Sequence, residues 1–444
     1  MGHLASKDAY HGVARKLDSL TVRTPHTPAL RAILEELYTP REAELVARMP
    51  TALCRLDQIA RVTGIDVREL EGLLEGLCAK GLVIDLFFER ESLPLYQVSP
   101  FVIGVFEFTM MRTASDADHR RRAHLFREYW ETFCAANMGA GRTSIARALP
   151  HEATLPSDDH VEVLDYERAS CVVDAADRFS VGICSCRHEK EHLGERGCDT
   201  PLDVCTGMGR GAEYMIRRGL AREISRTEMH ERLARSREQG LVLAADNVQK
   251  DVAFICHCCG CCCNILGAVT KYGYPGAIVS SSFEARIDRE KCTGCRRCQQ
   301  ACPVEAIELE PPRPGSAPLE PPRPGSGERK RRARVRPEAC IGCGVCATSC
   351  STGALTLVPH GRRVLHPADT FERVIVQALQ AGTLQNLVFD NPNSKAEGFM
   401  RGLLGGFLQL DAVKRALVSE RLRSVFLGRL ANVARRRSAS IGPT

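Results

Sequence analysis

The first hundred residues have the apolar spacing of short amphipathic helices followed by a hairpin. A proline begins the helix Arg41–Arg48, a glycine follows the helix Leu56–Thr63, and Val67–Ala79 keeps its leucines on one face. Together with one earlier helix, this pattern predicts four helices. Leu82–Phe88 and Leu95–Val98 then predict the two strands of a wing-like hairpin.

Further apolar stretches follow the hairpin and return near the C-terminus. Phe101–Phe106 predicts a buried strand or helix segment, and Asp116–Ala136, with the single tryptophan, predicts a long amphipathic helix. Phe371–Ala381 and Leu403–Leu430 predict helices, and the second is markedly basic. A basic amphipathic stretch can lie on an anionic membrane surface, and it can equally cover the cluster domain or a subunit interface.

Two copies of the spacing C-x2-C-x2-C-x3-C lie in the last third of the chain. Three thiolates on one tight loop can bind three corners of a cubane, whereas the fourth cysteine serves the other cluster. The spacing therefore predicts two [4Fe–4S] clusters, since structural zinc sites usually carry two C-x2-C pairs. The expected ligands are Cys292, Cys295, Cys298 and Cys350 for one cluster, and Cys302, Cys340, Cys343 and Cys346 for the other.

These motifs resemble a bacterial two-cluster, 2[4Fe–4S] ferredoxin domain with a βαβ-type repeat, over about residues 285–358. In that family each half is a short strand, a cluster loop and a helix. The resemblance places strands at Phe283–Ile287, Ala306–Leu309, Ala333–Val335 and Ala354–Val358. One departure from the family pattern is Ser351, which stands after the last cysteine where proline follows Cys302.

The second departure is a long insert between the two halves, at residues 310–332. The sequence Leu-Glu-Pro-Pro-Arg-Pro-Gly-Ser occurs twice there, at 309–316 and 319–326, and a basic run from Arg329 to Arg336 follows. A Pro/Gly-rich repeat cannot form a ladder or bury a core, so it predicts an extended surface loop. A docking arm for an acidic redox partner is the alternative.

Upstream, four cysteines follow the spacing C-x-C-x11-C-x6-C: Cys184, Cys186, Cys198 and Cys205. Four thiols within about twenty residues suffice for one tetrahedral metal or one cubane. Because C-x-C is uncommon in structural zinc sites, a third [4Fe–4S] cluster is favoured, with zinc and unligated thiols as alternatives. His188 and His192 could replace a cysteine as ligands.

A second cysteine run packs six thiols into eight residues: Cys256, Cys258, Cys259, Cys261, Cys262 and Cys263. Adjacent thiols cannot all face one way on a strand or helix, so a looped backbone that turns at Gly260 is expected. The run is a candidate for metal ligation, with three interpretations: a fourth cluster, extra ligands to the Cys184 site, or a reactive dithiol. His257 is a weaker candidate ligand.

Composition narrows the setting of these sites. The chain has 22 cysteines and no apolar leader segment, which favours ligands in a reducing cytoplasm over disulfides in a secreted protein. No stretch reaches the roughly 20 apolar residues needed to span a bilayer, so a cytoplasmic protein with at most peripheral membrane contact is expected. The formal charge of +6 is mild and does not indicate nucleic-acid binding. The oligomeric state is not indicated.

The N-terminal helices and hairpin resemble a winged-helix domain. Its recognition helix would present Glu69, Glu71 and Glu75 against Arg68 and Lys80. A helix that enters the major groove needs the opposite balance of charge to offset phosphate repulsion. A packing or partner-docking role is therefore favoured over DNA binding.

We expect an α+β multidomain chain with four parts. A winged-helix-like helical domain spans 1–112, and a cysteine-rich domain spans 113–282. The ferredoxin-type domain with its insert spans 283–360, and a helical basic region spans 361–444. The motif C-x-C-R, the motif P-x-D-V-C, the six-cysteine run and the ferredoxin pair together resemble a group of 4Fe–4S dicluster domain proteins of bacteria and archaea, over about residues 25–360. This resemblance implies iron–sulfur binding and no particular substrate.

Electron transfer is the function that these features favour, because two clusters provide a path in and out and the upstream cysteines extend it. The protein is then an electron-transfer protein with a redox partner, or a subunit of an iron–sulfur oxidoreductase. No P-loop or dinucleotide fingerprint is present, and no catalytic residue is indicated. Two alternatives stay open: a redox-sensing transcriptional regulator that uses the winged helix, and an iron–sulfur or metal assembly factor.

Overall fold

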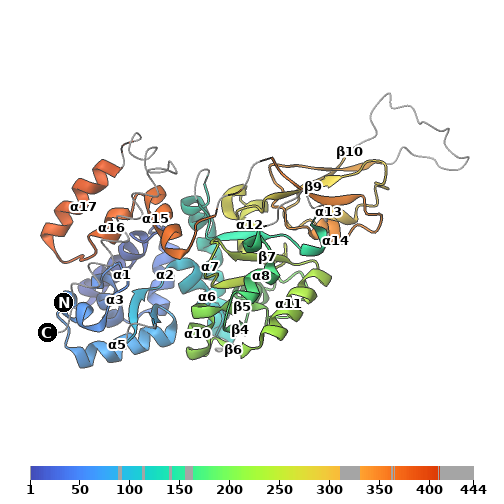
Figure 1. The fold of residues 1–444 in the computed structure, drawn as a ribbon. Helices are drawn as coiled ribbons and strands as arrows, with labels where there is room; N and C mark the ends of the chain where they lie inside the picture. The colour runs from blue at the N-terminus through green and yellow to red at the C-terminus, as the bar shows by residue number, and fades with distance from the viewer. Residues whose placement is uncertain are drawn as a thin grey trace, which may run out of the picture. The chain divides into compact units, whose positions relative to one another are not determined.

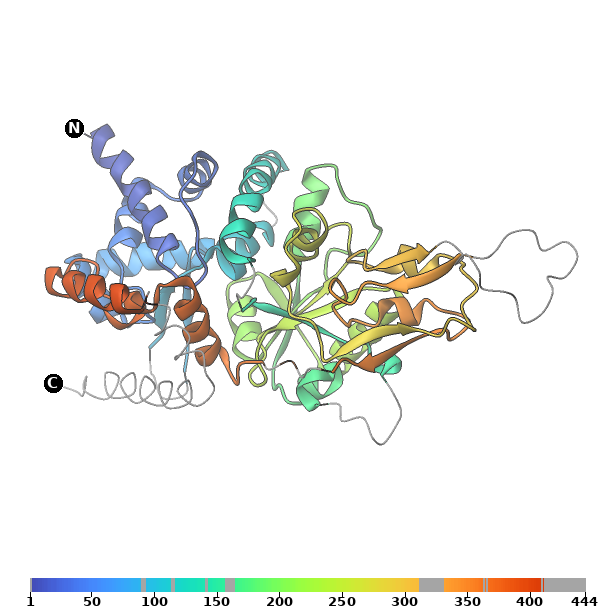
Figure 2. The same cartoon turned by 90° about the horizontal axis from the view of Figure 1, so that it is seen from above.

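The computed structural model describes residues 2–88, 93–112, 116–139, 143–155, 164–310, 331–361, 364, 366–408 and 410. The chain divides into two compact units (Figures 1 and 2). The first contains 1–109, 124–137 and 367–444, and the second contains 110–123 and 138–366. Among the described residues, no helix combines the length and the apolar character needed to cross a membrane.

The first unit begins with five helices, several of which have well-defined capping residues. Their bounds are α1 (Gly2–Asp18), α2 (Pro28–Leu37), α3 (Pro40–Arg48), α4 (Leu56–Thr63) and α5 (Val67–Lys80). Thr39 and Glu42 form a reciprocal capping box at the start of α3, which fixes its first turn. Gly64 and Gly81 adopt the left-handed conformation that ends α4 and α5.

A hairpin follows these helices, as predicted, and consists of β1 (Val83–Leu86) and β2 (Leu95–Val98) in antiparallel register. The predicted helices and strands are confirmed as elements, whereas their arrangement as a winged helix stays a prediction. The sequence pattern did not indicate α1. A kinked segment, Phe101–Val105, precedes α6 (Phe106–Met110) and α7 (Asp116–Asn137), the predicted long helix.

The C-terminal helices belong to the same unit as the N-terminal ones. They are α15 (Thr370–Ala381), α16 (Leu384–Val388) and α17 (Lys395–Leu408). The amide of Asn386 donates to the Ser19 carbonyl at 3.0 Å, and that of Asn393 donates to the Val62 carbonyl at 2.8 Å. The described part of the basic region thus packs on the N-terminal helices. The remainder of the predicted helix Leu403–Leu430 lies outside the described residues.

The second unit contains a six-stranded antiparallel sheet in the order β3-β7-β8-β5-β4-β6 (Figure 1). Its strands are β3 (Ala146–Leu149), β4 (Phe179–Gly182), β5 (Cys205–Met208), β6 (Ala221–Ile224), β7 (Val242–Asp246) and β8 (Phe254–Cys258). On one face Ile255 packs with residues of α8 (Ala169–Asp174) and α11 (Arg226–Glu238). The other face carries cysteines and packs on α12 (Asn264–Thr270) and the ferredoxin-type loops.

The ferredoxin-type region contains two pairs of antiparallel strands and two short helices. The strands are β9 (Phe283–Ile287), β10 (Ile307–Glu310), β11 (Arg332–Val335) and β12 (Leu355–Pro359), and the helices are α13 (Arg297–Ala301) and α14 (Val345–Thr348). β9 pairs with β12, and β10 pairs with β11 (Figure 2). The four predicted strands are confirmed to within a residue or two. Most of the predicted insert, residues 311–330, lies outside the described residues.

Candidate metal centres

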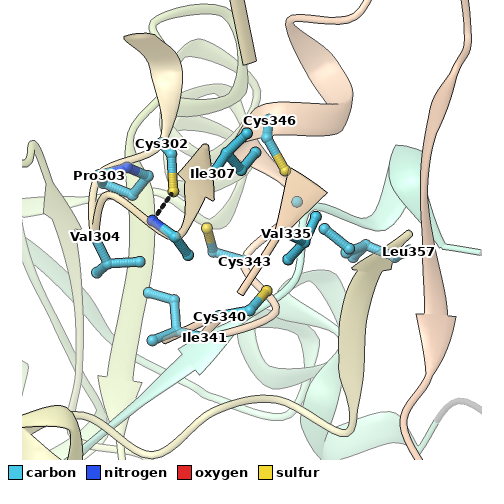
Figure 3. A pocket seen from close by; sticks show the side chains of 13 residues that line it. Cys302, Pro303, Val304, Ile307, Val335, Cys340, Ile341, Cys343, Cys346 and Leu357 are labelled. Carbon is cyan, nitrogen blue, oxygen red and sulfur yellow. Dashed lines mark hydrogen bonds between the residues drawn. The ribbon is translucent and has the colours of Figure 1, made fainter. Parts of the chain in front are cut away.

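One apolar cavity in the ferredoxin-type region is lined by four motif cysteines, which we call site II: Cys302, Cys340, Cys343 and Cys346. Figure 3 shows their sulfur atoms directed toward a shared space. The empty space here amounts to about 320 Å³, part of which is open to solvent, and its remaining wall is almost entirely aliphatic, including Ile341 and Leu357. Soft thiol donors around an apolar space suit a cubane, so these residues fit a [4Fe–4S] cluster.

The loop of site II depends on glycines with a left-handed backbone. Gly342 has φ 67°, and a Cβ there would run into the Phe283 carbonyl and the Ser281 hydroxyl. The carbonyl of Cys343 accepts a hydrogen bond of 3.0 Å from the backbone of His151. The backbone N–H of Ala306 donates to the Cys302 sulfur at 3.2 Å (Figure 3). The backbone therefore presets this loop for ligation and supplies an N–H to sulfur.

The other four motif cysteines form site I, which lies nearer the surface: Cys292, Cys295, Cys298 and Cys350. The Cys298 thiol is buried and interacts electrostatically with the thiols of Cys292, Cys295 and Cys350, so these four side chains lie together. Cys295 is exposed. Its neighbour Arg297 hydrogen-bonds the thiol and lowers the pKa of Cys295 to about 7. Arg297 also donates to the hydroxyl of Ser351, the residue that replaces the expected proline.

Burial has the opposite effect on the thiols of site II. It raises the pKa of Cys343 to about 12 and that of Cys346 well above its ordinary value. A buried thiolate without a cation is costly, because it loses its hydration. At site II the metal itself would therefore have to stabilise the cysteine thiolates. At site I an arginine already stands beside a thiol and stabilises its thiolate form.

The ten cysteines of the two upstream motifs form two groups in space, and each group takes members from both motifs. Six of them lie along the cysteine-bearing face of the sheet and at the starts of α9 (Ser185–His192) and α12. Five of these thiols are neighbours of one another in the order Cys205, Cys256, Cys258, Cys263 and Cys186. The charge of Cys186 acts on Cys184, the sixth member. We call these residues the six-thiol group.

The remaining four cysteines come together at one edge of this region: Cys198, Cys259, Cys261 and Cys262. Their sulfur atoms all lie within 4.8 Å of one another, and within the described parts of the chain no other set of three or more metal-ligating side chains does so. We call them the four-thiol group. The structure thus places Cys198 with three cysteines of the second cysteine run. The set expected from spacing, Cys184, Cys186, Cys198 and Cys205, stays a prediction.

The candidate histidine ligands have other partners. His257 alternates with Cys256 and Cys258 along β8, so its ring lies on the opposite face of the sheet. Its ring nitrogens pair with the hydroxyls of Ser236 at 2.5 Å and Thr206 at 3.2 Å. Burial lowers the pKa of His257 to about 3, which keeps the ring neutral.

The other two histidines lie on α9. The Nε2 atoms of His188 and His192 pair at 3.0 Å, and Nδ1 of His188 contacts the Met110 carbonyl at 2.6 Å. These contacts involve neither thiol group.

The upstream cysteines and site II share a hydrophobic core. Cys256, Cys258 and Cys263 pack in the same cluster of side chains as Cys302, Cys340 and Cys343. Gly260 lies against Pro303, the residue after Cys302, so closely that a Cβ would be 2.9 Å from the Pro303 carbonyl oxygen. The second cysteine run therefore contacts the site II loop directly. Sequence spacing gave no sign of this contact, because the two loops are joined only by tertiary structure.

The arrangement of the eight motif cysteines fits a ferredoxin-type iron–sulfur domain, and comparison with known proteins agrees. Residues 291–354 match the family model of the 4Fe–4S dicluster domain, a span that contains all eight cysteines of sites I and II. This chain therefore carries a dicluster ferredoxin-type domain.

Over 62 residues the chain is 44% identical to a protein of Methanosarcina acetivorans that is a subunit of an ion-translocating oxidoreductase complex. That match covers 14% of this chain and 22% of the relative, so it spans only about a fifth of the relative's length. No solved structure matches this chain.

Proposed function

We propose that this protein relays electrons between a redox partner and an iron–sulfur centre in its own cysteine-rich region. The path would run from site I to site II and on to a third [4Fe–4S] cluster held by four cysteines of the six-thiol group. The contact of Gly260 with Pro303 carries this proposal, because it joins the second cysteine run to the loop of a site II ligand. Similarity to a component of an ion-translocating oxidoreductase complex supports a role as an oxidoreductase subunit.

The crossed ligand sets are part of this proposal. A cluster bound in each site supplies a one-electron couple whose potential depends on burial and on hydrogen bonds to sulfur. Cys298 of the first loop lies with Cys350, and Cys302 lies with the thiols of the second loop. Cys302 and Cys350 follow the ends of α13 and α14, so each short helix would connect a cluster loop to a ligand of the other cluster.

The entry point for electrons would be site I. Cys295 is exposed, and the exposed side chains beside it include Lys291, Arg296 and Arg297. A cationic rim around an exposed ligand favours docking of an acidic partner and speeds its approach. At site II, by contrast, aliphatic residues such as Ile341 exclude water and partners. An exposed site I and a buried site II would suit a relay in which the partner exchanges electrons at site I.

Iron and acid-labile sulfide per chain, measured on anaerobically purified protein, test the cluster count. Three cubanes correspond to about twelve iron and twelve sulfide. Cys186→Ala, in the six-thiol group, should lower both by about four and leave the ferredoxin pair intact. Cys171→Ala serves as the matched control, because Cys171 lies on α8 outside every group. About eight of each in the wild type, unchanged in Cys186→Ala, would contradict a third cluster.

The relay itself is tested by stopped-flow reduction with dithionite, followed by rapid-freeze EPR. In the wild type the third cluster should be reduced together with or after the ferredoxin pair. In Cys340→Ala, which lacks a site II ligand, its reduction should slow at least about tenfold, as expected if an intermediate carrier is lost. Equal rates in the two proteins would refute the proposed path, even if all three clusters were present.

A further inference from the structure

The four-thiol group has the dimensions of a site for one metal ion. The sulfur of Cys198 lies 3.6 Å from that of Cys259 and 3.9 Å from that of Cys262, and the sulfurs of Cys261 and Cys262 are 3.6 Å apart. A tetrahedral ion with Zn–S bonds of about 2.3 Å places its sulfurs about 3.8 Å apart. The ligands of a cubane bind four different irons and must stand further apart. The group is therefore too compact for a cluster.

We propose that Cys198, Cys259, Cys261 and Cys262 bind a single zinc ion, separate from the iron–sulfur clusters. A tetrahedral set of four sulfurs suits zinc, which has no redox chemistry of its own. This inference goes beyond the relay, because the ion would carry no electron. It also assigns these cysteines to a mononuclear site and leaves the six-thiol group for the third cluster.

The surroundings compensate the charge of such a site. Zinc with four thiolates carries two negative charges, which a partly buried position must offset. The Arg187 side chain is fully buried, and its guanidinium lies 3.6 Å from the Cys259 sulfur. The backbone of Thr200 lies near the Cys198 sulfur and that of Gly197 near the Cys262 sulfur, and both favour the thiolate form. A guanidinium and N–H donors around the sulfurs are typical partners of a thiolate metal site.

The local backbone is shaped for close approach of two separate loops. Gly197, beside Cys198, has little room for a side chain, since a Cβ would lie 3.1 Å from the Cβ of Cys261. Residues 195–204 contain no helix or strand. The Arg196 guanidinium donates to the carbonyls of Cys198 at 3.0 Å and Thr200 at 2.6 Å. This irregular loop is thus held in one conformation before any ion binds.

The position of the site suggests what the ion does. It would join the loop at Cys198 to a second loop 61 residues further on, at Cys259. The second loop carries Gly260, which contacts Pro303 beside site II. A structural zinc here would fix the second cysteine run against the ferredoxin-type domain. Its function would be mechanical, since closed four-cysteine zinc sites stabilise folds and do not catalyse.

The test is metal analysis of the full chain, purified anaerobically and dialysed against EDTA. We expect one zinc per chain. The extended fine structure of its X-ray absorption spectrum (EXAFS) should show about four sulfur neighbours at about 2.3 Å and no iron neighbour. Cys261→Ala removes the exposed ligand and should reduce zinc retention at least about tenfold, with iron and sulfide unchanged. Cys261→His keeps a zinc ligand and should retain the ion.

Three outcomes would overturn the proposal. Loss of about four iron and four sulfide in Cys261→Ala would mean that a cubane binds there. Loss of one iron without sulfide would assign the site to iron, and unchanged metal would remove the site altogether. Because iron and sulfide are counted in the same samples, the zinc assignment can fail while the relay stands. The reverse result, zinc present without a third cluster, would leave this inference intact and refute the longer relay.

Discussion

Two copies of one cysteine motif produce a surface site and a buried site in the same domain. The first loop reads Cys-Thr-Gly-Cys-Arg-Arg-Cys and the second reads Cys-Ile-Gly-Cys-Gly-Val-Cys, with identical cysteine spacing. Thr293 is exposed, whereas its counterpart Ile341 is 4% exposed and lines the site II cavity. Arg297 is likewise exposed, whereas its counterpart Val345 is buried. Spacing thus determines which thiols can bind a cluster, and the residues between them determine how deeply it lies.

The difference in depth should appear most clearly when one ligand is removed from each site. Cys343→Ala deletes a buried thiol in the core shared with the sheet, so we expect loss of the site II cluster and a fall in thermal stability of the whole second unit. Cys295→Ala should release about four iron from site I, with a much smaller stability change, because the side chain is exposed. Iron analysis and thermal unfolding monitored by circular dichroism check both. If Cys343→Ala and Cys295→Ala lost equal thermal stability, the two sites would not differ in depth as described.

The apolar wall of site II gives the next largest effect. Ile341→Ala should lower the free energy of unfolding by about 2–4 kcal/mol, since a buried isoleucine is truncated in a packed core. Thr293→Ala, at the equivalent position of the other loop, should change it by less than about 0.5 kcal/mol. Chemical denaturation of the two variants under anaerobic conditions measures the difference. A small effect of Ile341→Ala would mean that the cavity wall is less tightly packed than its burial indicates.

The ferredoxin-type region was the most predictable part of the fold. Cysteine spacing and short β-branched runs locate its strands and its eight thiols, because both signals are local. The six-stranded sheet was not predicted, since strands such as Cys205–Met208 are only four residues long and include glycine. Burial on both faces also removes the alternation that marks a strand. The part of the second unit that holds this sheet was therefore expected only as a cysteine-rich region.

The grouping that the structure gives the upstream cysteines was not visible in the sequence, for a related reason. Cys205 and Cys256 are cross-strand partners on β5 and β8, and Cys198 meets the loop after β8. Which thiols meet depends on strand pairing, and strand pairing is tertiary. One local signal was available: Gly197 and Gly260 each stand beside cysteines of the four-thiol group, where the backbone approaches another segment closely.

The glycines of the two cluster loops allow a finer comparison. Gly342, in site II, and Gly353, after the last ligand of site I, both have positive φ, at 67° and 62°. A Cβ on Gly342 would overlap two oxygen atoms, whereas nothing lies within 4 Å of one on Gly353. Gly353→Ala should therefore cost about 1–2 kcal/mol from backbone strain alone. Gly342→Ala should cost at least about 1 kcal/mol more.

The same denaturation measurement checks this pair. If both variants lose equal stability, the overlap at Gly342 is relieved by a small shift of the Ser281 hydroxyl and the neighbouring strand. The site II loop would then be less constrained than the burial of its cysteines implies. A larger loss for Gly342→Ala, with retention of site I iron, would confirm that close packing is specific to the buried site.

The smallest expected effect concerns the charge at the surface site. Arg297 lies beside Cys295 and has no counterpart in site II, where Val345 takes its place. Arg297→Gln should slow the first phase of reduction by dithionite, an anion, by several-fold at low ionic strength, because electrostatic steering is lost. Arg297→Lys keeps the charge and should retain most of the rate.

Ionic strength separates steering from a change within the site. In roughly 0.5 M salt the exposed charges are screened, so the rates of the wild type and Arg297→Gln should converge. A deficit that persists at high salt would show that Arg297 acts through its hydrogen bond to the Cys295 sulfur, and so through the potential of site I. Either result sharpens the contrast with site II, where burial leaves no charged side chain in the cavity wall to perform this role.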